Sequence, residues 1–355
     1  MKCITGDKWL SVTGYWLMVI GLLLITGCSS DSTGTGEQRT DNTASSLQVM
    51  PYVANYQEGG SLMRAAVSEG YTAYTPAHDI VIGLYVLKNG EAVDNTIKLI
   101  SYSNHDWHSQ TTVENGAKYT IYGFMPKKDP ISSSISKSGD VATLTLSNIG
   151  TVCADDICFI TGVKDETGDL LQGQFGYTGK TSGNFIRLLM DHLFASVKFE
   201  FSVDTDYSKL RTIKVKSMKL STTTAPMTAT ITLTTNTTDN TTDAYPATVE
   251  FSSLGGESTP TTFFESTEGE QIPTTTTSFV CCFAPSASST LSLVTTYDVY
   301  DSKGNLIRKD CEATNKLPDL EAQRGYQVTL NLKITPTYLY QLSEPDLDNP
   351  TITIN

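Results

Sequence analysis

Apolar and polar side chains alternate along much of this chain with a period of two residues, which is the pattern of half-buried β-strands. In the segment 47–56, LQVMPYVANY, one face carries Leu47, Val49 and Val53. Pro51 has no N–H group to donate to a neighbouring strand, so this strand is predicted to lie at the edge of a sheet.

The same alternation, or a short apolar run between turn signals, predicts strands throughout both halves of the chain. IVIGLYVLKNG (80–90) reads as a buried strand that ends in an Asn-Gly turn, and AKYTIYGFM (117–125) is stopped by Pro126. No long stretch repeats with the 3.6-residue period of a helix, and the sequence allows at most short helices near 130–137 and 315–321. About seven short strands in each half predict an all-β fold built from β-sandwiches. The other predicted strands are 96–102, 107–113, 141–146, 156–163, 192–201, 213–220, 229–233, 248–251, 278–283, 291–300, 326–334 and 351–355.

The N-terminal residues have the pattern of a lipoprotein signal peptide rather than of a folded element. Lys2 and Lys8 form a positively charged start, and the apolar run that follows from Trp9 ends at Ile25-Thr26-Gly27-Cys28. A small residue before a cysteine at this place is a lipobox, so residues 1–27 are predicted to be removed and Cys28 to carry the lipid. Two acyl chains hold a protein on a membrane far better than one, which predicts stable anchoring at a bacterial envelope.

The remainder is predicted to consist of a tether and two domains, because 355 residues fit about two domains. Residues 28–46 lack hydrophobic periodicity and are expected to form a flexible tether. Predicted strands flank a junction at DHLFASVKFEFSV (191–203), which divides the folded part into 47–190 and 191–355.

Charge and motif content argue against several functional classes. The formal net charge is −13, and an acidic chain repels phosphate backbones, so nucleic acid is not an expected partner. The hydrolase, zinc-protease and nucleotide-binding motifs are missing, and we expect no enzyme activity, no metal and no cofactor. His105 and His108 face opposite ways on a strand, with exposed loop residues as the simpler interpretation. Asp155-Asp156 suggests calcium or glycosidase chemistry, with solvation and turn capping as the alternative.

Cysteine usage leaves the redox state open. Of 7 Cys, Cys3 lies in the predicted signal peptide and Cys28 is predicted to be acylated. Cys153 and Cys158 are close enough in sequence to close a small disulfide loop, and Cys281 or Cys282 is able to pair with Cys311. The alternative is that all five are buried reduced thiols.

A lone basic site, Leu62-Met63-Arg64-Ala65-Ala66, lies in a Gly-rich polar stretch without clear periodicity. An extended, strand-poor stretch of this kind is accessible to a protease. Cleavage between Arg64 and Ala65 would remove the strand predicted at 47–56. Arg39 in the tether is a competing site, and cleavage there would leave that strand in place.

Taken in order, these segments resemble the fimbrillins, the Bacteroidetes-type lipoprotein subunits of type V pili. The resemblance rests on the lipobox and tether, the Arg64-Ala65 site, AKYTIYGFMP (117–126), the junction at 191–203 and the tail YLYQLSEPDLDNP (338–350). It covers most of the mature chain, and the order and spacing of the segments carry it.

The resemblance implies two transthyretin-like β-sandwich domains and a structural role in a cell-surface fimbrium involved in adhesion. It further implies export to the outer membrane, cleavage by an Arg-specific protease, and assembly with other fimbrial subunits by exchange of a donor strand. The alternative within the same family is an anchor or a tip adhesin, a lipid-anchored binding protein that does not polymerise.

Overall fold

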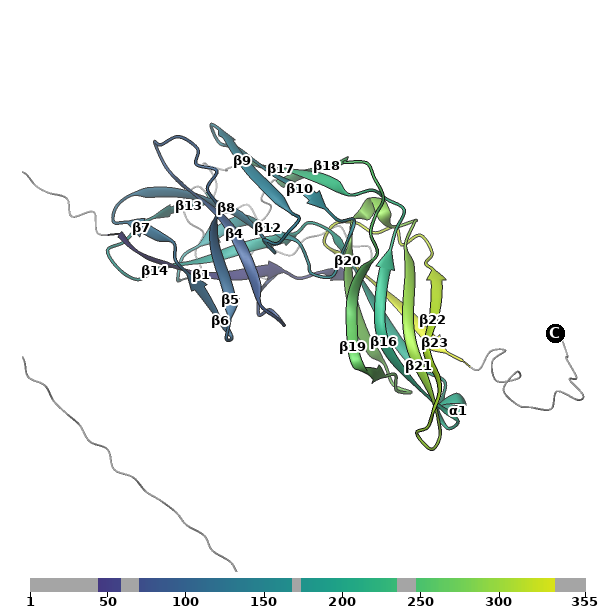
Figure 1. Cartoon of the computed structure of the whole chain (residues 1–355). Coiled ribbons are helices and arrows are strands. Elements are labelled where there is room, and N and C mark those ends of the chain that lie inside the picture. The colour runs from purple at the N-terminus through teal and green to yellow at the C-terminus, as the bar shows by residue number, and fades with distance from the viewer. Residues whose placement is uncertain (1–43, 59–69, 168–173, 235–246, 336–355) are drawn as a thin grey trace, which may run out of the picture. The chain divides into compact units, whose positions relative to one another are not determined.

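The computed structural model of the chain describes residues 44–58, 70–167, 174–234 and 247–335 (Figure 1). Strands dominate these residues, so the predicted all-β class is confirmed. The helical elements among them are α1 (Thr205–Ser208) and the short 3-10 helix η1 (Pro285–Ala287). Within these ranges no helix combines the length and the apolar character that a membrane crossing requires.

The largest sheet follows the order β3-β1-β14-β12-β8-β4-β5-β6, with β13 paired to β8 and β7 paired to β1. All its strands come from residues 44–192. β4 and β8 approach each other closely at Gly123, so that a Cβ atom at this position would lie 2.3 Å from the carbonyl oxygen of Gly83. The bounds are β1 (Ala44–Ala54), β3 (Tyr71–Ala73), β4 (Ile80–Lys88), β5 (Lys98–Ser103), β6 (Asp106–Ser109), β7 (Thr112–Glu114), β8 (Lys118–Met125), β12 (Cys158–Lys164), β13 (Gly176–Thr178) and β14 (Asn184–His192).

A four-stranded sheet of order β18-β17-β10-β9 shares the first hydrophobic core with this large sheet. The core side of β17 carries Ala229, Ile231 and Leu233, the alternating residues between the threonines, and all three are buried. Alternation therefore predicts this strand correctly despite its threonine-rich composition. The bounds are β9 (Ser132–Ser138), β10 (Val141–Ile149), β17 (Met227–Thr234) and β18 (Ala247–Ser253).

Two further sheets enclose the second hydrophobic core. Their orders are β11-β20-β15-β23-β2 and β19-β16-β21-β22, and the strands of the latter run side by side in Figure 1. The bounds are β2 (Gln57–Glu58), β11 (Val152–Cys153), β15 (Ala195–Val203), β16 (Arg211–Ser221), β19 (Thr261–Gln271), β20 (Thr277–Phe283), β21 (Ser292–Asp301), β22 (Leu306–Lys316) and β23 (Tyr326–Ile334).

Strand pairing crosses the division that the sequence suggests between residues 190 and 191. The hairpin β17–β18 comes from the second half of the sequence, yet β17 pairs with β10. In the other direction, β11 pairs with β20, and β2 pairs with β23. The two cores are therefore not built from two separate stretches of sequence.

Three local predictions are wrong. The segment 130–137 contains most of β9 rather than a helix, and Ile135 is the one buried residue of that strand. The segment 315–321 contains the end of β22 and no helix. The predicted strand 192–201 is two strands, since β14 ends at His192 and β15 begins at Ala195 after the buried pair Leu193-Phe194.

Candidate functional site: the first strand and its groove

The first described strand, β1, lies between β14 on one side and β3 and β7 on the other, and this position in the sheet is called its groove. The two strands run parallel, from Leu47 opposite Asn184 to Val53 opposite Met190 (Figure 1). The two strands lie about 140 residues apart in the sequence, so their pairing depends on long-range contacts alone. Pairing of this kind is slow to form during folding.

One face of β1 is buried from Leu47 to Val53. Leu47, Val49 and Val53 are 0%, 4% and 8% exposed, and Pro51 between them is also buried. The predicted face is therefore confirmed. Full burial of a Val or Leu side chain contributes roughly 1.5–3 kcal/mol to stability, so β1 is an integral part of the first core.

The other long edge of β1 is only partly covered. The antiparallel strand β7 pairs with Ala44–Ser46 at one end, and β3 pairs with Tyr52–Ala54 at the other. Between them, no strand of the described residues pairs with Gln48–Pro51 on this side. The prediction that this strand lies at the edge of a sheet is wrong, because β1 has β14 on one side and β3 and β7 on the other. Pro51, which has no N–H group to donate, lies between the pairings with β7 and β3, and its carbonyl oxygen accepts from the backbone N–H of Tyr74 at 3.0 Å.

A cluster of polar side chains holds the end of β1. His192, the last residue of β14, bonds through Nε2 to the carbonyl oxygen of Ala54 at 2.5 Å and through Nδ1 to Oδ2 of Asp156 at 2.6 Å. The ring of Tyr56 stacks on the His192 ring with centroids 3.7 Å apart. The segment that follows β1 is therefore fixed by side chains and not only by strand pairing.

Burial shapes the chemistry of this cluster. The hydroxyl of Tyr56 lies 3.4 Å from Sγ of Cys282, and burial, followed by the charges of Cys282 and Asp156, raises the pKa of Tyr56 well above its usual value. Burial likewise raises the pKa of the Cys158 thiol, and the neighbouring carboxylate of Asp156 adds to this effect. Both groups therefore stay neutral at physiological pH.

The other residues singled out from the sequence fall into two groups. Cys28, Arg64 and Ala65 lie outside the described residues, so acylation and cleavage remain predictions. The described cysteines are all free, and Cys153 and Cys158 do not form the disulfide considered from the sequence. They belong to different sheets, through β11 and β12, and each thiol contacts polar groups of its own.

The exposed histidines and the acidic pair have simple structural roles. His105 lies in a turn, and His108 bonds through Nε2 to the carbonyl oxygen of Ser103 at 3.0 Å. Asp155 pairs with Lys128 at 2.5 Å and with His78 at 2.9 Å. Asp156 instead turns to His192, a partnership that sequence reasoning missed because the two residues belong to separate segments.

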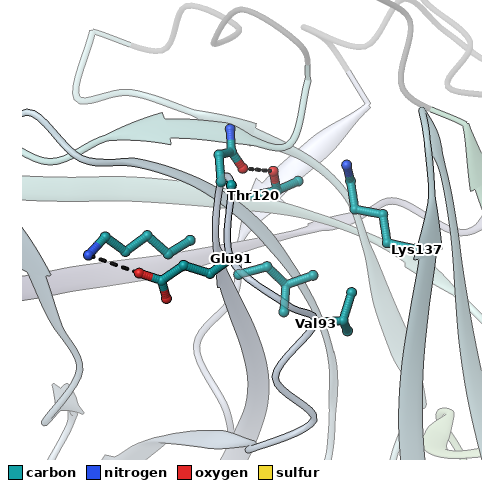
Figure 2. A pocket seen from close by; sticks show the side chains of 8 residues that line it. Glu91, Val93, Thr120 and Lys137 are labelled. Carbon is teal, nitrogen blue, oxygen red and sulfur yellow. Dashed lines mark hydrogen bonds and ion pairs between the residues drawn. The ribbon is translucent and has the colours of Figure 1, made fainter.

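A small hollow beside the Asn89-Gly90 turn is a weaker candidate for ligand binding than the cluster at His192 (Figure 2). Thr120 donates to the side-chain oxygen of Asn89 at 2.8 Å, and Lys88 pairs with Glu91 at 3.2 Å and with Glu114 at 3.1 Å. The polar groups of the hollow thus bond mainly to neighbouring side chains at the turn.

Comparison with known proteins gives structural matches alone. No protein-family model matches the chain, and neither does any curated protein. Among solved structures, a candidate cell adhesion protein from Bacteroides fragilis NCTC 9343 is 13% identical with a TM-score of 0.43, and the match covers 81% of this chain and 93% of that one.

Two further matches have fimbrial descriptions. A fimbrial protein from Bacteroides vulgatus ATCC 8482 is 14% identical with a TM-score of 0.34, covering 72% of this chain and 88% of that one. The fimbrial anchor protein Mfa2 from Porphyromonas gingivalis is 10% identical with a TM-score of 0.22, covering 81% and 90%. The matches are thus to the kind of protein that the sequence resembles, and at these TM-scores the function has to be inferred from the chain's own residues.

Proposed function

We propose that this chain is a structural subunit of a cell-surface fimbrium that assembles by protease-activated strand exchange. In this proposal Cys28 carries the lipid with which the precursor reaches the outer membrane. An Arg-specific protease then cuts between Arg64 and Ala65. Other fimbrial subunits, of the same or a related kind, are the partners. The two hydrophobic cores correspond in this proposal to two transthyretin-like sandwiches.

The observation that carries the proposal is the position of β1. It is joined to the rest of the fold through the segment 59–69, which contains Arg64, and it fills a groove lined by the first core. Cleavage at Arg64 would leave β1 without a covalent link to the chain. Its departure would uncover apolar side chains and the backbone groups of β14, which are costly to leave unpaired.

A strand from a second subunit relieves that cost. The incoming strand satisfies the backbone hydrogen bonds of β14 and places alternate apolar side chains in the vacated positions, which is β-augmentation. Donation from one subunit to the next is a head-to-tail contact that does not close on itself, so repetition produces a fibre.

The cluster around His192 favours a second function, that of an anchor or tip adhesin that keeps its first strand. The bond from Nε2 to Ala54, the stacked ring of Tyr56 and the pairing of β2 with β23 all retain the segment 54–58 after β1 itself. A subunit that remains lipid-anchored and does not polymerise requires such retention.

One experiment separates these functions. The full chain and its Arg64→Ala variant are treated with an Arg-specific protease, and oligomers are followed by gel electrophoresis without heating, with the new N-terminus sequenced. The proposal expects Ala65 as the new N-terminus and ladders of heat-dissociable oligomers from the unsubstituted chain, and no ladders from the Arg64→Ala variant. Arg39→Ala serves as the matched control and should still form ladders. Equal ladders from the Arg64→Ala variant would refute cleavage-dependent assembly, and an intact, lipid-linked chain without ladders would support the anchor.

A further inference from the structure

Three side chains with metal-binding atoms meet at the end of the groove. Asp156 precedes β12, Cys158 begins it, and His192 ends β14 directly opposite Cys158 in the strand register. Their candidate ligand atoms all lie within 4.8 Å of one another. Thiolate and imidazole are ligands for zinc and related ions, and they do not suit calcium or magnesium.

Hydrogen-bond accounting shows that a proton or a cation is needed between two of these groups. The carbonyl oxygen of Ala54 only accepts, so Nε2 of His192 must carry the hydrogen of that bond. In a neutral ring Nδ1 then presents a lone pair, and it faces Oδ2 of Asp156 at 2.6 Å. Two acceptors at this distance require either a proton between them, carried by the ring or by the carboxyl group, or a cation.

The distances suit a tetrahedral metal ion with little rearrangement. Sγ of Cys158 lies 3.7 Å from Nδ1 of His192 and 3.4 Å from Oδ2 of Asp156. Ligand atoms around tetrahedral zinc, with bonds of about 2.0–2.3 Å, lie about 3.5 Å apart. Only the contact between Asp156 and His192 is too short, and rotation of the carboxylate by less than about 1 Å would correct it.

Two features of the surroundings point to a ligand independently of these distances. Oδ1 of Asp156 is buried and has no hydrogen-bond partner among the described residues, although a buried carboxylate oxygen normally has one. The bond from His192 to a backbone carbonyl is also the usual device that fixes the tautomer and orientation of a metal-bound histidine.

We propose that Asp156, Cys158 and His192 form a binding site for one divalent transition-metal ion of the zinc type. A water molecule takes the fourth position, as is common where the protein supplies three ligands. Binding displaces the thiol proton of Cys158 and the ring proton shared between His192 and Asp156. The ion then occupies the place between the two acceptors, next to the stacked ring of Tyr56.

Cobalt substitution tests the site without dependence on any variant. The full chain is purified in detergent, stripped with a chelator, and titrated with Co²⁺ under reducing conditions. The proposal expects one equivalent to produce thiolate-to-cobalt charge-transfer absorption and the intense visible bands of tetrahedral cobalt. Zinc should abolish both signals, and elemental analysis should find one zinc per chain. If the cluster exists only as the ion pair of His192 and Asp156, neither absorption signal will appear on addition of Co²⁺. That result would overturn the proposal.

Variants assign the ligands. Cys158→Ser and His192→Gln should weaken zinc binding by at least about tenfold, the scale on which even supporting partners of a metal ligand act. Cys311→Ser and His108→Gln are matched controls, because both residues lie outside the cluster, and they should bind zinc as the unsubstituted chain does. Circular dichroism confirms that each variant is folded. Equal affinity in the Cys158→Ser variant would show that the metal binds elsewhere.

Discussion

The ring of Tyr56 lies almost parallel to the ring of His192, with an interplanar angle of 14° and centroids 3.7 Å apart. Tyr56 belongs to the segment that cleavage at Arg64 would release, whereas His192 belongs to the strand that would stay. The contact therefore covers the proposed metal site with a residue of the removable segment. Departure of that segment would uncover Cys158 and His192, so the proposed strand exchange and metal binding are coupled through this pair.

Truncation of Leu47 should destabilise the whole fold. Its side chain is fully buried in the first core, and deletion of a buried leucine typically costs about 2–5 kcal/mol of unfolding free energy. Urea unfolding of the Leu47→Ala variant measures this loss. Gln48→Ala is the matched control on the same strand, because Gln48 is exposed, and it should change the unfolding free energy by less than about 0.5 kcal/mol. An equal, small effect of both variants would mean that β1 is not packed into the core.

Thiol labelling should separate Cys311 from the other described cysteines. Cys153, Cys158, Cys281 and Cys282 are buried, whereas Cys311 is half-buried. Burial raises the pKa of Cys153 to about 12, so very little of the reactive thiolate forms at neutral pH. Peptide mapping after brief treatment with iodoacetamide should find Cys311 labelled in the native protein and all five labelled in urea. Failure of Cys153 and Cys158 to label in urea without reductant would reveal the disulfide considered from the sequence.

The sequence was sufficient for strands with one buried and one polar face, such as β1, β10 and β17. It missed β14, whose residues from Leu188 to His192 are all buried, because a strand covered on both sides does not alternate. It also missed the mostly exposed and polar β19. The cluster at His192 depends on the register that places Cys158 opposite His192, and no local pattern encodes the pairing of two residues that are 34 positions apart in the sequence.

Stability should fall in alkali, partly through Tyr177. Its hydroxyl donates to the side-chain oxygen of Asn184 at 2.6 Å, and burial raises its pKa from 10.0 to about 12. A raised pKa means that the stabilisation is complete below pH 10 and is lost as the pH rises to about 12. Unfolding free energies measured over this range should fall less steeply in the Tyr177→Phe variant. An unchanged slope would show that Tyr177 does not titrate differently in the folded state.

A synthetic peptide of residues 44–58 should block assembly of the cleaved subunit. The peptide carries Leu47, Val49 and Val53, which fill the groove, and Tyr56, which stacks on His192. Because it lacks a folded subunit at its other end, it occupies the groove of β14 without extending the fibre. Added in excess to protein cut at Arg64, it should suppress the oligomer ladder and restore the unfolding midpoint of the uncut chain. A control peptide with Asp at positions 47, 49 and 53 keeps the backbone but places charge against the core, so it should do neither. Equal suppression by both peptides would mean that binding in the groove does not depend on the apolar face of β1. Ladders that persist with the first peptide would mean that assembly uses another surface.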